Sequence, residues 1–492
     1  MDKNKMEDFK AIVKEIEYLN YILHSVLYWD KVTHMPKKEI EYRNEVNTYV
    51  GGLLHQLLSS EDINEFIQSY EKEHNKNQIL DATIRRIQQL KQPVSDIPED
   101  EYRKYIHLIS KAENLWNRAR IVGDFELMAP YYSKIFDFFK EFAEYWSYEE
   151  DPYDALIQFY IEGYSTQKMD EMVKYLKIPL QEKMKEREKL FIKNNSFQIK
   201  NIHKEKQFEL WKLVLDEIGF DFEAGRLDVG SFTTILSNSP TDVRIVNEFS
   251  EEDIFIGIFN VLHSGGKAIY KQKIDKNLRG TLLGEPPSFV MEEAIGRFYE
   301  NIIGRSKGFW KRILPKIKSV LHELKPYSLE DIYTKVNLCK PSPIRMNADE
   351  ITYLLHIIIR YEIEKEIISG NYDIDQIEHI WNEKYKEYLG VEPKDSKEGI
   401  LQDVHWAAGY IGYFPTYLIA TVASSQFAYF LEKKYGDIDF LIQKDGLYTI
   451  NRWMEKNIFR WGAIYEFKEL VNMTCGEDLN PRYYLEYLNN KF

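Results

Sequence analysis

Helical periodicity runs through most of this chain and restricts its possible folds more than any other feature. Apolar residues recur three and four positions apart with charges between them, as in helices that bury one face. A hydrophobic share of 44% can close a large core, so the pattern predicts a mainly helical protein. We expect helices at residues 6–30, 39–58, 76–92, 99–119, 124–146, from 168 onward with an interruption at Pro179, and at 204–219, 251–273, 288–303, 307–321, 347–369, 374–388 and 416–434.

One short region departs from this periodicity. Residues 231–235 and 243–249 are rich in Thr, Val, Ile and Phe, and they flank the turn sequence SNSPTD. We predict a β-hairpin at 231–249, followed by a helix that begins near Glu251. Substrate contacts and plain structural pairing both remain open as the role of this small sheet.

The chain lacks the stretches that usually separate domains. It has 24 Gly and 16 Pro in 492 residues, no repeat period and no low-complexity tract. Domain boundaries normally fall in polar, flexible linkers of that kind. We therefore predict one continuous domain over residues 1–492.

The charge balance and the cysteine count limit the class of protein. The 65 Lys and Arg against 79 Asp and Glu give a formal net charge of −14, which argues against a dedicated nucleic-acid binder. The two cysteines, Cys339 and Cys475, do not form a disulfide framework or a CxxC pair. The first residues are charged and unlike a signal peptide. We expect a cytoplasmic protein.

The longest uncharged run raises the question of a membrane span. Residues 406–431 contain no Asp, Glu, Lys or Arg, and the run is long enough to cross a bilayer. However, it contains Gly409, Gly412 and Pro415, and tyrosines lie in its middle rather than at its ends. We interpret it as a buried wall of the protein and expect no membrane contact.

The most informative segment is GILQDVHWAAGYIGYFPTY, residues 399–417. It resembles the signature of the carboxypeptidase Taq family, which are zinc metallocarboxypeptidases. Further matching segments occur in the family's order at residues 27–36, 152–160, 242–245, 299–310, 348–370 and 381–390. The resemblance implies a single large helical body with a deep central cleft, a small β-sheet beside the active-site helix, and a homodimer.

The family's metal site rests on HExxH in a helix and a Glu from a following helix. Histidines at i and i+4 share a helix face, and the intervening Glu takes a proton from the zinc-bound water. By resemblance, His263 is the first ligand and Glu293 the third. Ser264 stands in place of the general-base Glu, Lys267 in place of the second His, and Glu292 in place of a His beside the third ligand.

These replacements change the expected chemistry. A lysine binds a metal only after losing a proton from a group whose ordinary pKa is near 10.4. A Ser hydroxyl is no base near neutral pH. We hypothesise that the ammonium of Lys267 occupies the metal's position and pairs with Glu293 and also with Glu292. We expect no cofactor, and zinc, cobalt or manganese only if the altered site still binds metal.

Other positions match the family's substrate contacts. The resemblance places Asp242 and Arg244 in a DxRxT element of the cleft, Arg345 at the substrate's terminal carboxylate, and His405 and Tyr417 as donors to the developing oxyanion. Residues two apart on a strand share a face, so a structural salt bridge explains Asp242 and Arg244 equally well. A core histidine is the alternative for His405.

Two adjacent glycines follow the altered motif. Gly265 and Gly266 each cost a helix roughly 1 kcal/mol relative to Ala, so they need a reason. Either close helix packing or space for a bound peptide supplies one.

Three functions follow from these observations. The leading one is a catalytically inactive or strongly impaired pseudopeptidase that still binds peptides with a free C-terminus. The second is an active metallocarboxypeptidase with an altered centre that releases C-terminal amino acids. The third is a non-catalytic structural or interaction partner of an active paralogue.

Overall fold

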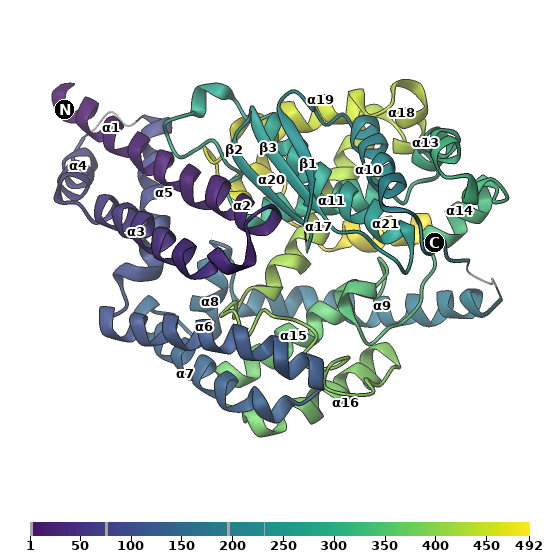
Figure 1. Cartoon of the computed structure of the whole chain (residues 1–492), viewed down its shortest axis with the longest axis horizontal. Helices are drawn as coiled ribbons and strands as arrows, with labels where there is room; N and C mark the ends of the chain where they lie inside the picture. Colours follow the sequence, from purple (N-terminus) through teal and green to yellow (C-terminus); the bar gives the residue numbers. More distant parts are fainter. Residues whose placement is uncertain (1–2, 74–76, 194–196, 231) are drawn as a thin grey trace. The chain divides into compact units, whose positions relative to one another are not determined.

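The computed structural model describes residues 3–73, 77–193, 197–230 and 232–492, which form two compact units (Figure 1). Unit 1 comprises Met1–Pro93, Gln198–Tyr333 and Phe427–Asp478. Unit 2 comprises Val94–Phe197, Thr334–Gln426 and Leu479–Phe492. Each unit is therefore built from segments far apart in sequence. The single continuous domain over residues 1–492 stays a prediction, as does the deep central cleft.

Unit 1 is helical apart from one small sheet. Its helices are α1 (Lys3–Asn20), a π-helical turn (Tyr21–Leu27), α2 (Tyr28–Thr33), α3 (Ile40–Leu58), α4 (Glu61–Glu71), α5 (Gln78–Ser95), α10 (Lys204–Ile218), α11 (Ile254–Gln272), α12 (Phe289–Arg297), a second π-helical turn (Phe298–Ile303), α13 (Lys307–Val320), α14 (Leu329–Val336), α18 (Ile438–Asp445), α19 (Tyr448–Asn457) and α20 (Phe467–Cys475). Helices α5 and α14 end beyond the boundaries of this unit.

The described part of unit 2 is helical. Its helices are α6 (Glu99–Val122), α7 (Ala129–Trp146), α8 (Pro152–Tyr160), α9 (Thr166–Lys193), α15 (Tyr353–Ile368), α16 (Ile377–Leu389), the first part of α17 (Phe414–Tyr435) and α21 (Arg482–Lys491). The mainly helical prediction is confirmed.

The predicted interruption at Pro179 is wrong. Helix α9 continues through this proline. A proline removes one backbone donor and leaves the carbonyl four residues earlier without its partner. That carbonyl belongs to Tyr175, which is 48% exposed, so water reaches this side of the helix. Leu176 and Leu180 are fully buried, and their packing favours the continuous helix.

The predicted hairpin is present, and a third strand joins it. Strands β2 (Thr234–Ser239) and β3 (Asp242–Asn247) pair antiparallel, and β1 (Gly225–Val229) pairs parallel with β3, giving the order β1-β3-β2. The turn is shorter than predicted, because most of SNSPTD lies within the strands. The predicted position Ser231 lies outside the described residues. Parallel pairing of β1 is non-local and leaves no hairpin signal in the sequence.

Helix α11 lies against this sheet and holds the central position in unit 1 (Figure 1). It begins at Ile254 because the side chain of Asp253 caps it, accepting a hydrogen bond from the backbone N–H of Phe255. It packs against β2 and β3, and also against α10 and α12. Almost all of its residues are buried, so polar side chains on this helix need partners within the protein.

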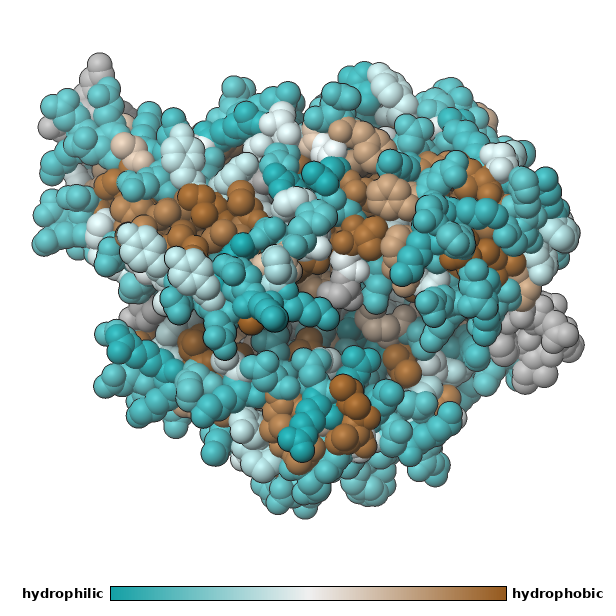
Figure 2. Space-filling view, in the orientation of Figure 1, coloured by the Kyte–Doolittle hydropathy of each residue, from teal (hydrophilic) through white to brown (hydrophobic). Residues whose placement is uncertain are grey.

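The N-terminal helices of unit 1 have a core of their own. Phe9, Val13 and Ile16 from α1 are buried with Ile63 and Phe66 from α4. Figure 2 shows hydrophobic side chains on the surface of these helices as well, and Ile22, Val26 and Ile40 are among the exposed residues there.

The uncharged run at 406–431 is mostly buried, as predicted. Most residues from Trp406 to Leu431 are buried, and they include the first four turns of α17. Across the described ranges, no helix combines the length and apolarity that a bilayer crossing requires.

Candidate active site

The altered HExxH segment lies in the middle of α11, with its polar side chains toward α12. Nζ of Lys267 donates a hydrogen bond of 2.6 Å to Oε2 of Glu293. Nε2 of His263 lies 3.2 Å from the same oxygen. Lys267 and His263 are four residues apart and therefore share a helix face. The structure thus brings together the three positions at which the resemblance places metal ligands.

Both carboxylate oxygens of Glu293 contact basic side chains. Its other oxygen, Oε1, accepts a hydrogen bond of 3.1 Å from Nε of Arg297. Only 3% of its side chain is exposed. Burial by itself raises the pKa of this carboxyl, but Lys267, His263 and Arg297 together hold the pKa well below its usual range. The carboxylate is therefore ionised and fully engaged.

Glu300 belongs to the same cluster and was not predicted. It lies in the π-helical turn that follows α12. Its Oε2 is 3.0 Å from Nδ1 of His263 and accepts a hydrogen bond of 3.1 Å from Nη1 of Arg297. Burial raises the pKa of Glu300, yet Arg297 and His263 lower it to about 2. Both ring nitrogens of His263 consequently face carboxylates.

The predicted pairing of Lys267 with Glu292 is wrong. Glu292 lies 3.3 Å from Nζ of Lys271, which also donates to Glu285. Lys271 is one helical turn beyond Lys267 on the same face of α11. Each lysine is therefore paired with a different acid of the adjacent segment.

The two glycines after Ser264 serve close helix packing. A Cβ on Gly265 would lie 2.6 Å from Cδ1 of Ile218 in α10, and a Cβ on Gly266 would lie 2.6 Å from Cδ2 of Tyr299. Both distances are shorter than real contacts, so neither position accepts a side chain without movement. Between the two explanations offered by the sequence, helix packing is the one that the structure shows.

Gly296 has a comparable role that was not predicted. A Cβ there would lie 2.7 Å from Cε1 of His263 and 2.9 Å from Cε of Lys267. Because Gly296 has no side chain, α12 can approach α11 closely at this site. The sequence signal was a glycine within a helical pattern, which usually marks close approach.

The donor set does not suit a zinc ion. Zinc takes thiolate, neutral imidazole or carboxylate ligands, and a protonated lysine amine repels it. Here the amine of Lys267 lies against the carboxylate that would be the third ligand, while Ser264 stands where the general base would be. Ser264 is itself buried. Within the described ranges, no group of three or more His, Cys, Asp or Glu side chains is arranged to hold a metal.

Asp242 and Arg244 form a two-pronged ion pair on β3. Nε and Nη2 of Arg244 donate to the two oxygens of Asp242 at 2.9 Å each. This is the salt bridge that the sequence offered as the structural explanation. Hydrogen bonding to Asp242 raises the pKa of the guanidinium, which stays charged. The side chain of Arg244 is 18% exposed and that of Asp242 is 28% exposed. A substrate contact of these residues stays a prediction.

A second pair on the neighbouring strand was missed. Arg226 is paired in register with Arg244 and donates to Asp228 in the same manner. The ring of Trp29 lies 4.7 Å from the guanidinium of Arg244 and 5.1 Å from that of Arg226. Its indole N–H donates to Asp228 at 2.9 Å. The signal in the sequence is the repeated Arg and Asp spacing of two, in RLD and DVR.

The remaining predicted residues belong to unit 2. Nε and Nη2 of Arg345 donate to Oδ1 of Asp403 at 3.0 and 2.8 Å. Arg360, which is fully buried, donates to the other oxygen of Asp403 at 2.7 Å. Burial raises the pKa of Asp403, but the two guanidiniums hold it well below its usual range. One carboxylate thus joins two cations, which leaves one positive charge unbalanced in this group.

His405 and Tyr417 lie beside that group. Nε2 of His405 is 3.3 Å from the hydroxyl of Tyr417, and the guanidinium of Arg345 lies 5.5 Å from the ring of Tyr417. Burial lowers the pKa of His405 to about 3, so the ring is neutral at neutral pH. Its Nδ1 is buried without a hydrogen-bond partner among the described residues. A core histidine would normally have both nitrogens satisfied.

Comparisons with known proteins match almost the whole chain. Residues 8–492 match the family model described as "Carboxypeptidase Taq (M32) metallopeptidase". Carboxypeptidase 1 of Bacillus subtilis is 36% identical, over 99% of this chain and 97% of that protein. Thermostable carboxypeptidase 1 of Pyrococcus furiosus is 32% identical, over 99% of this chain and 98% of that protein.

Solved structures agree with these matches. A structure of Pyrococcus furiosus carboxypeptidase has a TM-score of 0.95 with 31% sequence identity, covering 100% of this chain and 99% of that one. Metallocarboxypeptidase 1 of Trypanosoma cruzi has a TM-score of 0.94 with 27% identity, covering 100% of both chains. The resemblance read from residues 399–417 is therefore confirmed. The chain belongs to the carboxypeptidase Taq (M32) family of metallopeptidases.

Proposed function

We propose that this chain is a carboxypeptidase-like protein that binds peptide C-termini and does not hydrolyse them through a zinc centre. The observation that carries the proposal is the 2.6 Å hydrogen bond from Lys267 to Glu293. It joins the position of the second histidine ligand to that of the third ligand. A covalently attached cation stands there in place of a metal, and no cofactor is required.

The energetic argument favours this arrangement over metal binding. At pH 7, releasing the proton of an ordinary lysine amine costs about 5 kcal/mol. A metal would also have to displace Glu293 from Lys267 and Arg297, which together satisfy both of its oxygens. Removing one partner from a buried ion pair typically costs about 3–5 kcal/mol. Both costs oppose the binding of zinc, cobalt or manganese.

Peptide binding is proposed from the charge arrangement in unit 2. Arg345 and Arg360 share the single carboxylate of Asp403, so the group retains one positive charge. A C-terminal carboxylate balances that charge, and a planar guanidinium suits its geometry. The neutral His405 and the hydroxyl of Tyr417 add uncharged hydrogen-bonding groups beside it.

The test is a pair of measurements on the full-length protein. Fluorescence anisotropy with a labelled peptide library should show binding that is lost when the C-terminus is amidated. Metal analysis after dialysis should find less than stoichiometric zinc. Arg345→Lys keeps the charge but removes the two-pronged geometry, and it should weaken binding without unfolding the protein. Equal binding of free and amidated peptides would refute the proposal.

A second candidate is an active carboxypeptidase with an altered centre. It is favoured by the 3.2 Å contact between His263 and Glu293, which leaves two of the family's ligand positions adjacent. Both curated relatives described above carry the name carboxypeptidase. Release of C-terminal amino acids in zinc, cobalt or manganese, abolished by Glu293→Ala, would establish this function instead.

The assembly is proposed from the family resemblance, and the location from the low cysteine count. We expect a homodimer in the cytoplasm with no nucleic-acid partner. Light scattering of the purified protein should give twice the mass of the 492-residue chain. Co-purification with an active paralogue would favour an interaction partner over an independent peptide binder.

A further inference from the structure

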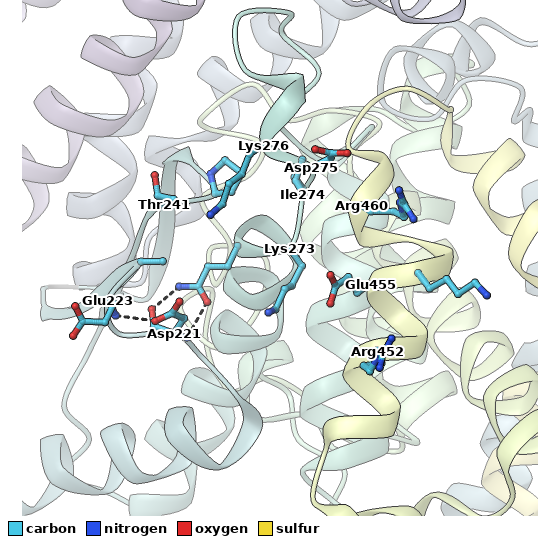
Figure 3. A pocket seen from close by; sticks show the side chains of 14 residues that line it. Asp221, Glu223, Thr241, Lys273, Ile274, Asp275, Lys276, Arg452, Glu455 and Arg460 are labelled. Atoms are coloured by element: carbon cyan, nitrogen blue, oxygen red, sulfur yellow. Dashed lines mark hydrogen bonds between the residues drawn. The ribbon is translucent and has the colours of Figure 1, made fainter.

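Unit 1 contains a polar cavity that is distinct from the His263 cluster. It has a volume of about 890 Å³ and lies at the C-terminal end of α11, between that end and α19 (Figure 3). Lys273, which follows α11, is ten residues from His263, a separation of about 15 Å along a helix. The cavity volume falls within the range of small-molecule sites.

The walls of this cavity are rich in basic side chains. Lys273 and Lys276 come from the end of α11 and the turn after it, whereas Arg452 and Lys456 come from α19 and Arg460 follows it. Five basic residues stand against four acidic ones in a chain whose total charge is −14. The lining of this cavity is therefore more basic than the chain as a whole, whose net charge is negative.

Most of these cations lack an acidic partner. Within the described ranges, Lys273, Lys276, Lys456 and Arg460 form no ion pair, and all four are exposed. Arg452 donates to the hydroxyl of Tyr448 at 3.0 Å, and the carboxylate of Glu455 interacts with it electrostatically. Like charges gathered without partners repel one another, so an anionic ligand is the group that would stabilise them.

Two of the four acidic residues accept hydrogen bonds from nearby backbone amides. Oδ1 of Asp221 accepts a hydrogen bond from the backbone N–H of Glu223, and Oδ1 of Asp275 accepts one from Asn277, both at 2.9 Å. These carboxylates cap turns of the chain. They keep their negative charge, so the five basic and four acidic residues of the lining give it a formal net charge of +1.

The walls are also held in place by hydrogen bonds. The side-chain amide of Gln272 accepts a hydrogen bond from the backbone N–H of Asp221 at 3.0 Å and donates one to its carbonyl at 2.8 Å. The backbone N–H of Asp275 donates to the carbonyl of Arg460 at 3.3 Å, which joins the two basic walls. A site whose frame is fixed before binding loses less entropy when a ligand arrives.

We propose that this cavity binds a small molecule carrying two or more phosphate groups. Cations on two walls require anionic groups at two places in the ligand, and the volume exceeds what a single phosphate fills. Lysine and arginine are the side chains that proteins use for phosphates. The proposal is independent of the function of the His263 cluster.

Isothermal titration of the full-length protein with inorganic pyrophosphate, triphosphate and orthophosphate tests it. At 0.15 M salt we expect one binding site, with triphosphate and pyrophosphate bound at least about tenfold more tightly than orthophosphate. Lys273→Glu and Lys456→Glu should each weaken binding by about tenfold. Lys325→Glu, at an exposed lysine outside the cavity, carries the same charge change and should alter affinity less than about twofold.

Three results would overturn the proposal. They are the absence of saturable binding, an equal loss in Lys325→Glu, and tighter binding of a zwitterion such as glycylglycine than of pyrophosphate. Thermal unfolding of each variant without ligand checks that the exchanged residues, all exposed, leave the fold intact.

Discussion

Nζ of Lys267 and Oε2 of Glu293 are 2.6 Å apart and join two helices, α11 and α12, through a buried ion pair. The two side chains are only 9% and 3% exposed. This pair stands where the family has two of its metal ligands by resemblance. The stability of the protein and its response to engineering should therefore depend on it.

Lys267→Met should destabilise the protein strongly. It leaves Glu293 buried with one cation fewer, and breaking a buried pair in this way typically costs about 3–5 kcal/mol. The double variant Lys267→Met with Glu293→Gln should recover part of that loss, because no buried charge is left uncompensated. Urea unfolding of both variants measures the coupling. A single variant that loses less than about 1 kcal/mol would show that the pair is energetically unimportant.

Restoring the family motif should create a metal site. Ser264→Glu with Lys267→His supplies the missing base and ligand on the helix face that carries His263. We expect the double variant to take up one zinc ion per chain, measured by elemental analysis after dialysis, and the unmodified protein to take up none. Lys267→His alone serves as the control for the ligand without the base. A double variant that stays free of zinc would show that the site has been reshaped beyond these two side chains.

Replacing a glycine by alanine should have opposite effects at Gly266 in the candidate site and at Gly52 in α3, because the space around them differs. In Gly266→Ala the new Cβ would lie 2.6 Å from Cδ2 of Tyr299, so the variant should lose about 1–3 kcal/mol. Gly52→Ala lies within α3 with no atom within 4 Å of the new Cβ, and it should gain about 0.5–1 kcal/mol. Thermal unfolding of the two variants compares them directly. Equal effects would contradict the packing argument.

Stability should fall as the pH rises from about 4.5 to about 7 because of Glu364 in unit 2. Its carboxylate accepts hydrogen bonds from Tyr153 and Trp406 at 2.6 Å each and from the backbone N–H of Gly412 at 3.0 Å. Burial nevertheless dominates and raises its pKa to about 7.

Between the ordinary glutamate pKa of 4.5 and about 7, the folded state therefore holds this proton more tightly than the unfolded state. The free energy of unfolding should decrease over this range by about 3 kcal/mol from Glu364 alone. Glu364→Gln, which does not titrate, should remove this part of the pH dependence. Urea unfolding at pH 5, 6, 7 and 8 gives the comparison, and parallel curves for the two proteins would rule out the assignment.

The sequence predicted the parts of the fold that depend on local pattern. Amphipathic periodicity located most of the long helices, and the turn between β2 and β3 followed from Pro240 and its neighbours. Strand β1 was missed because its parallel pairing joins residues distant from the hairpin turn. The two compact units leave no local signal in the sequence, since each combines segments from different parts of the chain.

The candidate site also contains residues that the sequence predicted and residues that it did not. The pairing of Lys267 with Glu293 followed from the family resemblance, which places Glu293 at the third ligand position, and from helix geometry, which puts Lys267 on the same face as His263. Glu300 was missed because the π-helical turn that carries it breaks the 3.6-residue period on which such reasoning depends. Arg297 was also missed, although it lies four residues after Glu293 within α12. Trp29 was noted only as part of a matching segment, and its contacts with Arg226 and Arg244 depend on the tertiary fold.

A cation that is part of the polypeptide behaves differently from a bound metal. The ammonium of Lys267 is tethered to α11, so dilution, chelators and changes in metal supply do not remove it from Glu293. Nor does exchange among zinc, cobalt and manganese in the medium alter its charge. The ion pair that connects α11 and α12 is therefore present as soon as the chain folds and does not depend on uptake of a metal.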